Sequence, residues 1–464
     1  TTALQYSITV VVGETLSDKE KKDILTHMHD QASHKVITNV SAIANMYSYI
    51  DEAHEAVEID LEDLGIESLK SMNQQLELEL SEEVIDRLFD LYANDIKRNP
   101  YDLEILSFFD ALSIKDRAGH LHAGSSDEMK ALKKRILGHP EVMSALEVHS
   151  AIYFREKFKN YYRCLDTGMY KERSPSCFTT SYMRLYQDLD TCPYESGQSA
   201  LGFSIGQASS VGAGSKPIAH AMIIGVAHKF HQESSDSKIP VASARQTLMD
   251  TNIGIARYAN SIGLPLLDAR ITALSYPLRG EEYCPSLHKP IVFNKVIGEV
   301  FSKNYLDKPI QPGYELIIIG SPVMNVGDVA TKLAGGVAKA SYNHMHHHGI
   351  DLMNIAQIDM QVRCQEVISA CSELDDNPIS VVEALGEGGI TRALLYILQS
   401  DKEQNYGFEI QLRNIHAVRN DFTAMQIWGS EMQERYLIIC PADKLQAILH
   451  FADRERCPYA TIGR

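Results

Sequence analysis

The stretch Leu316-Ile-Ile-Ile-Gly320-Ser-Pro-Val-Met-Asn325-Val-Gly327 decides how the C-terminal part of this 464-residue chain is expected to fold. Four large apolar residues followed by a glycine are typical of a buried strand that ends in a turn. Glycines in such a turn let backbone N–H groups approach an anion closely. The stretch therefore predicts either a ligand-binding turn, with Asn325 and Gly327 beside the ligand, or a tight turn packed by small residues.

Two more glycine-bearing segments indicate the same kind of turn. Small residues in Ala334-Gly335-Gly336-Val-Ala338 lead into a helical pattern, and Gly386-Glu-Gly388-Gly389 joins a predicted strand to a predicted helix. Glycine permits backbone conformations with φ > 0, and it leaves room for a ligand. We expect four positions to lie beside a bound ligand, with tight packing as the alternative: Gly335, Gly336, Gly388 and Gly389.

The segment that contains the only tryptophan combines several groups that bind ions. Trp428-Gly-Ser-Glu431-Met-Gln433-Glu434-Arg435 holds two carboxylates, an amide and a guanidinium. Such groups are typical ligands of Mg²⁺ and of phosphate, which makes Glu431 a candidate ligand of Mg²⁺ and Arg435 a candidate contact of a phosphate. A salt-bridge network at a domain edge is the alternative, and composition alone favours it. A cluster of four histidines lacks acidic or cysteine partners at suitable spacing, which favours a solvated loop: His344, His346, His347 and His348.

Composition excludes several classes of protein. The chain has 44 Lys+Arg against 61 Asp+Glu, a formal net charge of −17, so it has no basic surplus for binding nucleic acid. It has no apolar run of about 18 residues, so we expect no membrane span. The eight cysteines are scattered without a C-x-x-C pair, which disfavours structural zinc and a disulfide framework. These features predict a cytoplasmic protein with reduced thiols.

The order of patterns along the chain predicts an α+β protein with four parts. Residues 1–80 indicate a small ferredoxin-like unit, and 81–162 a helical linker domain that opens at the N-cap Ser81. Alternating apolar runs and helical patterns predict two further domains over 163–325 and 326–464. The expected strands are 5–12, 56–61, 76–80, 219–227, 316–320, 380–385 and 436–440, and the expected helices include 17–30, 329–340, 360–371 and 391–398.

The C-terminal motifs, taken in order, resemble the large form of phosphoribosylformylglycinamidine synthase of purine biosynthesis. The Gly320–Gly327 turn is similar to the family's Gly-Gly-Pro-Ala-Met-x-Ile-Gly, and Arg98-Asn-Pro upstream is similar to its linker motif. Four further segments match family motifs: Arg363-Cys-Gln-Glu-Val-Ile368, Phe408-Glu-Ile with Leu412-Arg413, Ile427–Tyr436, and Arg454-Glu-Arg-Cys-Pro-Tyr-Ala460. The resemblance covers nearly the whole chain loosely.

The resemblance implies an aminoimidazole-ribonucleotide-synthetase-like pair of α/β domains behind the N-terminal unit and the linker. It also implies that ATP and Mg²⁺ act with glutamine-derived ammonia to convert formylglycinamide ribonucleotide into its amidine. The family has a second synthetase-like pair and a glutaminase domain as well. The start at Thr1 and the end at Arg464 are therefore interpreted as those of a fragment, whose partners are the missing half or a second copy in a homodimer.

Several family positions differ in this chain. Glu383-Ala384 stands where the family has His-Asp, and Gly202-Phe-Ser-Ile-Gly-Gln207 replaces its Gly-Gly-Glu-Ile-Arg-Asp. Because loss of one charged ligand commonly reduces catalysis strongly, we expect this chain to be inactive by itself. The alternative function is that of a catalytically degenerate relative that acts as a scaffold or protein-binding module.

Overall fold

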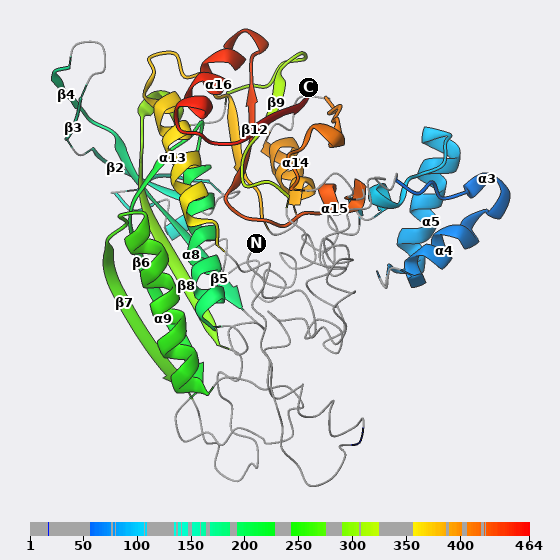
Figure 1. Cartoon of the computed structure of the whole chain (residues 1–464), viewed down its shortest axis with the longest axis horizontal. Coiled ribbons are helices and arrows are strands. Elements are labelled where there is room, and N and C mark those ends of the chain that lie inside the picture. The colour runs from blue at the N-terminus through cyan, green and yellow to red at the C-terminus, as the bar shows by residue number, and fades with distance from the viewer. Residues whose placement is uncertain are drawn as a thin grey trace.

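The computed structural model describes part of the chain, namely Ser17 and residues 56–75, 78, 80–105, 107–108, 134–135, 138–140, 142–146, 151–157, 159–163, 168–185, 193–227, 243–274, 290–305, 308–323, 356–386, 389–400, 406–418, 422 and 424–464. Within these residues, two large sheets with their helices, a two-stranded hairpin and a separate group of N-terminal helices form the molecule (Figure 1). The fold is therefore mixed α+β, as the sequence predicts.

The larger sheet has six strands in the order β1-β2-β5-β8-β6-β7. Helix α9 (Ala244–Ser261) joins β6 to β7, which are parallel, and the other pairs are antiparallel. Helix α8 (Pro193–Ser209) lies beside α9 on the sheet, and their apolar side chains share one core (Figure 1). The strands are β1 (Val142–Leu146), β2 (Ala151–Lys157), β5 (Ser176–Leu185), β6 (Lys216–Ala227), β7 (Leu266–Leu274) and β8 (Ile291–Val300).

The smaller sheet has four antiparallel strands in the order β10-β11-β9-β12. Apolar helix residues pack on both of its faces, so its central strands are continuous apolar runs instead of alternating ones. Helices α13 (Ile358–Glu373) and α16 (Leu445–Arg454) supply one core, and α14 (Gly389–Ser400) and α15 (Ala424–Trp428) supply the other. The strands are β9 (Glu315–Gly320), β10 (Val381–Ala384), β11 (Arg435–Cys440) and β12 (Tyr459–Gly463).

The two sheets are joined through α8, which is buried over almost its whole length. Ser210, directly after α8, accepts a hydrogen bond from the backbone N–H of Ala384 in β10, at 2.8 Å. Gln365 of α13 donates to the carbonyl of Ser215, at 3.0 Å. The small residues of α8 allow this close packing, since a Cβ at Gly206 would lie 3.1 Å from the Ala384 side chain.

The N-terminal group consists of short helices with their own apolar core. Ser81 caps α5 as the sequence predicts, because its Oγ accepts from the N–H of Val84 at 3.4 Å. Trp428 of α15 donates from Nε1 to Ser107 Oγ at 2.6 Å, which links this group to the smaller sheet. The elements are α3 (Leu61–Leu64), α4 (Ile66–Gln75), α5 (Glu82–Asp90) and a π-helical turn (Leu91–Ile96), and a hairpin of β3 (Asn160–Arg163) and β4 (Tyr170–Arg173) lies elsewhere in the chain.

Most elements expected in the C-terminal part are present. The predicted strands over 219–227, 316–320, 380–385 and 436–440 correspond to β6, β9, β10 and β11. The predicted helices over 360–371 and 391–398 correspond to α13 and α14. The expected elements at 5–12, 17–30 and 329–340 lie outside the described residues, apart from Ser17.

Three sequence expectations are wrong. Residues 56–61 are not a strand, because Asp60 accepts from the N–H of Asp63 at 2.9 Å and caps α3 instead. The linker over 81–162 is not helical throughout, since β1, β2 and the first residues of β3 lie in it. Ala151 and Tyr153 of β2 are fully buried in the larger sheet. The boundary at 325 falls too late, because β9 pairs with β11 and β12 of the smaller sheet.

One further expectation concerns membranes. Among the helices that the structure describes, none combines the length and the hydrophobicity needed to cross a bilayer.

Candidate functional site

Three strands of the smaller sheet end or begin at one edge. Arg435, the first residue of β11, pairs with Gly320, the last residue of β9, and Tyr436 pairs with Ala384 at the end of β10. Helix α14 begins at Gly389, five residues after β10 ends, and Gly389 donates from its N–H to the carbonyl of Gly386 at 2.7 Å. This edge therefore brings two of the predicted glycine turns close to the segment of the only tryptophan.

Arg435 is the charged residue at the centre of this edge. Its side chain is among the largest that are fully buried, with 1% of the residue exposed. Nη1 donates to Ser430 Oγ at 3.1 Å, while Nε and Nη2 have no acceptor within the part of the chain that the structure describes. Burial lowers the pKa of Arg435 to about 10. A buried guanidinium with two unused donor nitrogens has a strong electrostatic preference for an anion.

The first turn of α14 lies next to this guanidinium. A Cβ at Gly389 would lie 3.3 Å from the carbonyl oxygen of Ser430, the residue that Arg435 contacts. The first N–H groups of a helix have no acceptor within the helix, and they carry its positive dipole end. Arg392 adds a second charge in this turn. It is 5% exposed, donates from Nη2 to the Ala384 carbonyl at 2.9 Å, and has no acceptor for Nε among the described residues.

Helix α8, which packs on the larger sheet, lies against these strand ends of the smaller sheet. Gln433 donates from Nε2 to Ser199 Oγ at 2.8 Å. A Cβ at Gly386 would lie 3.4 Å from Gln433 Cγ and 3.5 Å from Phe203 of α8. The Arg392 guanidinium carbon lies 4.9 Å from the ring centroid of Phe203. We call the group Arg392, Gly386, Gly389, Ser430, Gln433 and Arg435 the strand-end site, and it lies where the two sheets meet.

Glu434, between Gln433 and Arg435, faces away from the strand-end site and toward α9 of the larger sheet. Its backbone has φ 54°, which is rare for a residue other than glycine. Oε1 accepts from the Tyr258 hydroxyl at 2.9 Å, and Oε2 accepts from the N–H of Gln357 at 3.3 Å. Burial raises the pKa of Glu434 to about 7, and the Tyr258 hydrogen bond partly opposes this. Glu434 therefore joins α9 to β11.

The structure places three of the eight predicted site residues. Gly389 and Arg435 lie together in the strand-end site, and Glu431 is half-buried in the turn before β11. Asn325, Gly327, Gly335, Gly336 and Gly388 lie outside the described residues. This stretch of described residues ends at Val323, two residues before Asn325. The N–H of Val323 donates to the His416 carbonyl at 2.7 Å.

The sequence motifs do not single out Arg392 of the strand-end site, nor do they reveal the buried contacts of Glu434. Glu434 belongs to the quoted motif, but its contact with Tyr258 joins residues 176 positions apart, which spacing along the chain cannot reveal. No cluster of three or more His, Cys, Asp or Glu side chains suited to a metal occurs in the described residues. The strand-end site offers guanidinium, amide and hydroxyl groups, so its donor set fits an anion and not Mg²⁺.

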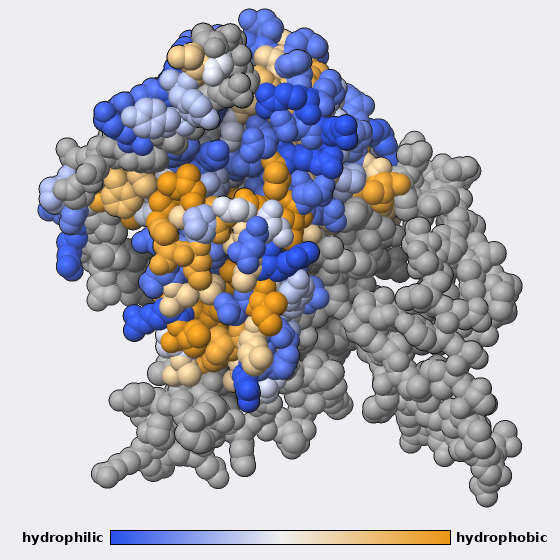
Figure 2. All heavy atoms as spheres, turned by 60° about the vertical axis from the view of Figure 1, so that its left-hand side comes forward, coloured by the Kyte–Doolittle hydropathy of each residue, from blue (hydrophilic) through white to orange (hydrophobic). Residues whose placement is uncertain are grey.

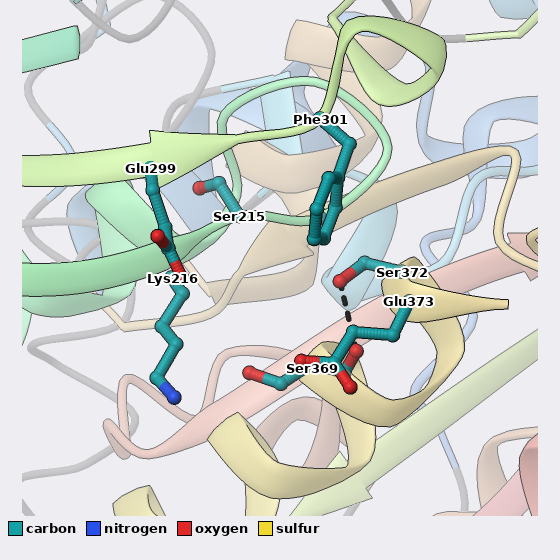
Figure 3. A pocket seen from close by; sticks show the side chains of 8 residues that line it. Ser215, Lys216, Glu299, Phe301, Ser369, Ser372 and Glu373 are labelled. Atoms are coloured by element: carbon teal, nitrogen blue, oxygen red, sulfur yellow. Dashed lines mark hydrogen bonds between the residues drawn. The ribbon is translucent and has the colours of Figure 1, made fainter. Parts of the chain in front are cut away.

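A separate pocket lies between the end of β8 and the last turns of α13 (Figure 3). Its hydroxyl groups are used inside the protein, since Ser372 Oγ donates to the Ser369 carbonyl at 2.9 Å and Ser215 Oγ donates to the Ala208 carbonyl. The pocket is therefore a poorer candidate for a ligand site than the strand-end site. Its lining residues are Gly214, Ser215, Lys216, Glu299, Phe301, Ser369, Ser372 and Glu373.

The fold defines a class of protein, an α+β chain with an AIR-synthase-like fold, and its strand-end site holds two buried guanidinium groups. Residues 311–464 match the family model of AIR synthase related protein, C-terminal domain. That range begins just before β9 and includes the whole smaller sheet. It therefore agrees with a domain boundary before β9 instead of at residue 325.

Solved structures of Thermotoga maritima PurL have a similar fold. Similarity to PurL complexed with ADP gives a TM-score of 0.51 at 15% identity, over 81% of this chain and 49% of that chain. For PurL complexed with ATP the TM-score is 0.50 at 15% identity, over 82% of this chain and 50% of that chain. For PurL complexed with FGAR the TM-score is 0.50 at 15% identity, over 82% of this chain and 52% of that chain. This chain spans about half the length of those proteins, and at this identity the likeness concerns the fold alone.

Proposed function

We propose that the strand-end site binds the phosphate groups of a nucleotide, and that the chain is the N-terminal portion of a phosphoribosylformylglycinamidine synthase. The observation that carries the proposal is Arg435, a fully buried guanidinium with two donor nitrogens that have no described acceptor. The ordered motifs of the C-terminal part and the PurL-like fold support the choice of family. In this proposal ATP is the nucleotide and the protein acts in the cytoplasm.

Three side chains of the strand-end site and the start of α14 have distinct parts in the proposed binding. Arg435 and the N-terminus of α14 neutralise phosphate oxygens, and Arg392 adds positive charge beside them. Gln433, held by Ser199, fixes the turn against α8. In the family reaction ATP phosphorylates the amide oxygen, and ammonia then displaces the phosphate. Fixed donors stabilise the negative charge that develops in such a transfer.

Mg²⁺ belongs to the proposed function only through the resemblance. Glu431 is the predicted ligand, and Mg²⁺ is commonly held by one or two carboxylates together with substrate phosphates. We assign no step to the metal, because the residues of the strand-end site include no carboxylate and the described residues hold no cluster suited to a metal.

A scaffold without catalysis is the second candidate function. The observation in its favour is the extent to which polar groups beside the site are used to join the two sheets. Gln433 bonds to Ser199, and Glu434 bonds to Tyr258 and Gln357. In this case Arg435 would remain an unpaired buried charge whose role is not ligand binding.

Calorimetric titration with ADP and with ATP, each with and without Mg²⁺, distinguishes the two functions. The nucleotide proposal predicts that Arg435→Met reduces affinity at least tenfold. Arg464→Met is the matched control, because Arg464 directly follows β12 of the same sheet and lies in an exposed ion pair with Glu409. Absence of nucleotide binding by the unmodified chain would contradict the nucleotide proposal and favour the scaffold.

Thermal unfolding of Arg435→Met shows whether lost binding reflects lost structure. Replacing an unpaired buried charge by an apolar side chain of similar volume is often neutral or stabilising. We therefore expect the midpoint of unfolding to stay the same or rise, while binding falls. A large fall in the midpoint would mean that Arg435 holds the fold through contacts within the protein.

A further inference from the structure

Four of the described cysteines lie in one core, between α13 and the smaller sheet. Cys364, Cys371, Cys440 and Cys457 are all free and buried. Within the described chain, Cys364 and Cys457 are the pair whose sulfurs are in contact, with Sγ to Sγ at 3.7 Å. A disulfide needs a separation of about 2.05 Å, so small rotations of the two side chains would close the gap.

The backbone on both sides of this thiol pair is fixed. Cys364 lies in the middle of α13, and Cys457 lies in the turn between α16 and β12. Arg363, next to Cys364, donates from Nη1 to the carbonyl of Arg456, next to Cys457, at 2.7 Å. Cys457 donates from its N–H to the Ala452 carbonyl at 2.8 Å. These bonds hold the turn against α13, so the two thiols face each other in a defined geometry.

The thiols have only weak competing partners. Cys364 Sγ lies 3.7 Å from the Glu434 carbonyl, and Cys457 Sγ lies 3.7 Å from the Pro458 carbonyl. Thiols are weak hydrogen-bond donors, so little is lost when both sulfurs turn toward each other. No described residue would have to leave the space between the sulfurs, because they already touch.

We propose that Cys364 and Cys457 form a reversible disulfide and that this pair is a redox modification site of the C-terminal unit. The proposal is independent of the nucleotide proposal. The oxidant is a small organic disulfide. The Cys457 thiolate attacks one sulfur of that disulfide, which breaks its S–S bond and releases one small thiolate. Cys364 then attacks the Cys457 sulfur and releases the second small thiolate.

This exchange is balanced in atoms and electrons. Two protein thiols and one small disulfide become one protein disulfide and two small thiols, and the two thiol protons pass to the released thiolates. Burial raises the pKa of Cys364 well above its ordinary value, so the thiolate is scarce in the reduced fold. We therefore expect slow oxidation, in which Cys457 reacts first because it is 3% exposed, whereas Cys364 is fully buried.

Oxidation by hydroxyethyl disulfide under native conditions tests the proposal. The chain is equilibrated with the disulfide and 2-mercaptoethanol at a series of ratios. Free thiols are then blocked by alkylation, and disulfide-linked peptides are identified by mass spectrometry. We expect a linked peptide pair that contains Cys364 and Cys457, which disappears after reduction. Its absence, while the half-exposed Cys177 is modified, would overturn the proposal.

Thermal unfolding gives a second measurement. The disulfide would close a loop that contains β10, α14, β11 and α16, and long loops gain the most from a cross-link. We expect oxidation to raise the unfolding midpoint of the unmodified chain and of the control Cys371→Ser, whose sulfur lies in the same core. The rise should be lost in Cys364→Ser and in Cys457→Ser. A rise that persists in either of these two variants would contradict the proposal.

Discussion

Glu434 and Arg435 are neighbours in the chain, yet their side chains enter different environments. Glu434 reaches Tyr258 in the larger unit, whereas Arg435 reaches Ser430 beside the first turn of α14. The positive φ of Glu434 gives the backbone the bend that separates them. Neither ionisable side chain forms an ion pair among the residues described here. Substituting either residue should therefore change a measurable property, ligand affinity for Arg435 and the pH dependence of stability for Glu434.

Glu434 should make the stability of the protein depend on pH. Its pKa is about 7 in the folded chain against an ordinary value of 4.5, so the folded chain binds the proton more tightly. The stabilisation is fully present below pH 4.5 and is lost as the pH rises through 7. Relative to Glu434→Gln, which does not titrate, we expect the unmodified chain to lose about 3 kcal/mol of unfolding free energy between pH 4.5 and 8.

Urea unfolding of both proteins across this pH range measures the difference directly. Tyr258→Phe supplies a directional control, because the Tyr258 hydroxyl lowers the pKa of Glu434 by donating a hydrogen bond to it. Without that donor, the pH at which stability is lost should move upward. Parallel curves for the unmodified chain and Glu434→Gln would show that the carboxyl does not titrate in this range.

At the scale of single elements, the end of β9 depends on one glycine. Gly320 has φ 108°, and a Cβ there would lie 2.2 Å from the carbonyl oxygen of Glu434. That oxygen already accepts from the N–H of Ser321 at 3.0 Å. A side chain at Gly320 would therefore combine backbone strain with a clash against the turn that carries Glu434 and Arg435.

Gly320→Ala should destabilise the protein much more than a matched glycine substitution. Gly313 also has a positive φ, 87°, but a Cβ there would meet nothing within 4 Å. We expect Gly313→Ala to lower the unfolding free energy by about 1–3 kcal/mol through strain alone, and Gly320→Ala to exceed that. Chemical denaturation measures both. Equal losses would mean that the turn before β11 moves easily away from β9.

Sequence patterns predicted the elements of the smaller sheet because burial on both faces leaves a simple signal. Residues 316–319 of β9 are all apolar and all buried. Strand β2 does not show this signal. Its apolar run Ala151-Ile-Tyr-Phe is followed by Arg155, Glu156 and Lys157, and these charges favour a helical interpretation. The sequence predicts part of the candidate site, because Arg435 belongs to a motif that combines several ion-binding groups. The contacts of Glu434 with Tyr258 and of Arg392 with Phe203 involve helices distant in the chain, so no local motif indicates them.

At the scale of the whole molecule, apolar side chains remain exposed on the larger sheet. They gather around the edge strand β7, the neighbouring β6 and α9, on the side that Figure 2 turns toward the viewer. Leu267 is 62% exposed and Ile271 is 59% exposed. An edge strand with exposed apolar residues is a surface suited to pairing with another sheet. The members of this apolar edge are Ile223, Met249, Ile253, Leu266, Leu267 and Ile271.

We expect the isolated chain to form a dimer through this apolar edge. Burial of exposed leucine and isoleucine side chains supplies the driving force, because each contributes about 1.5–3 kcal/mol when it is fully removed from water. The double variant Leu267→Lys with Ile271→Lys should shift the equilibrium to monomer, since it places like charges on both sides of the pairing. Analytical ultracentrifugation over a range of concentrations measures the association constant. Val418→Lys, at an exposed apolar residue of another unit, should leave it unchanged. A double variant that associates as tightly as the unmodified chain would place the interface elsewhere on the surface.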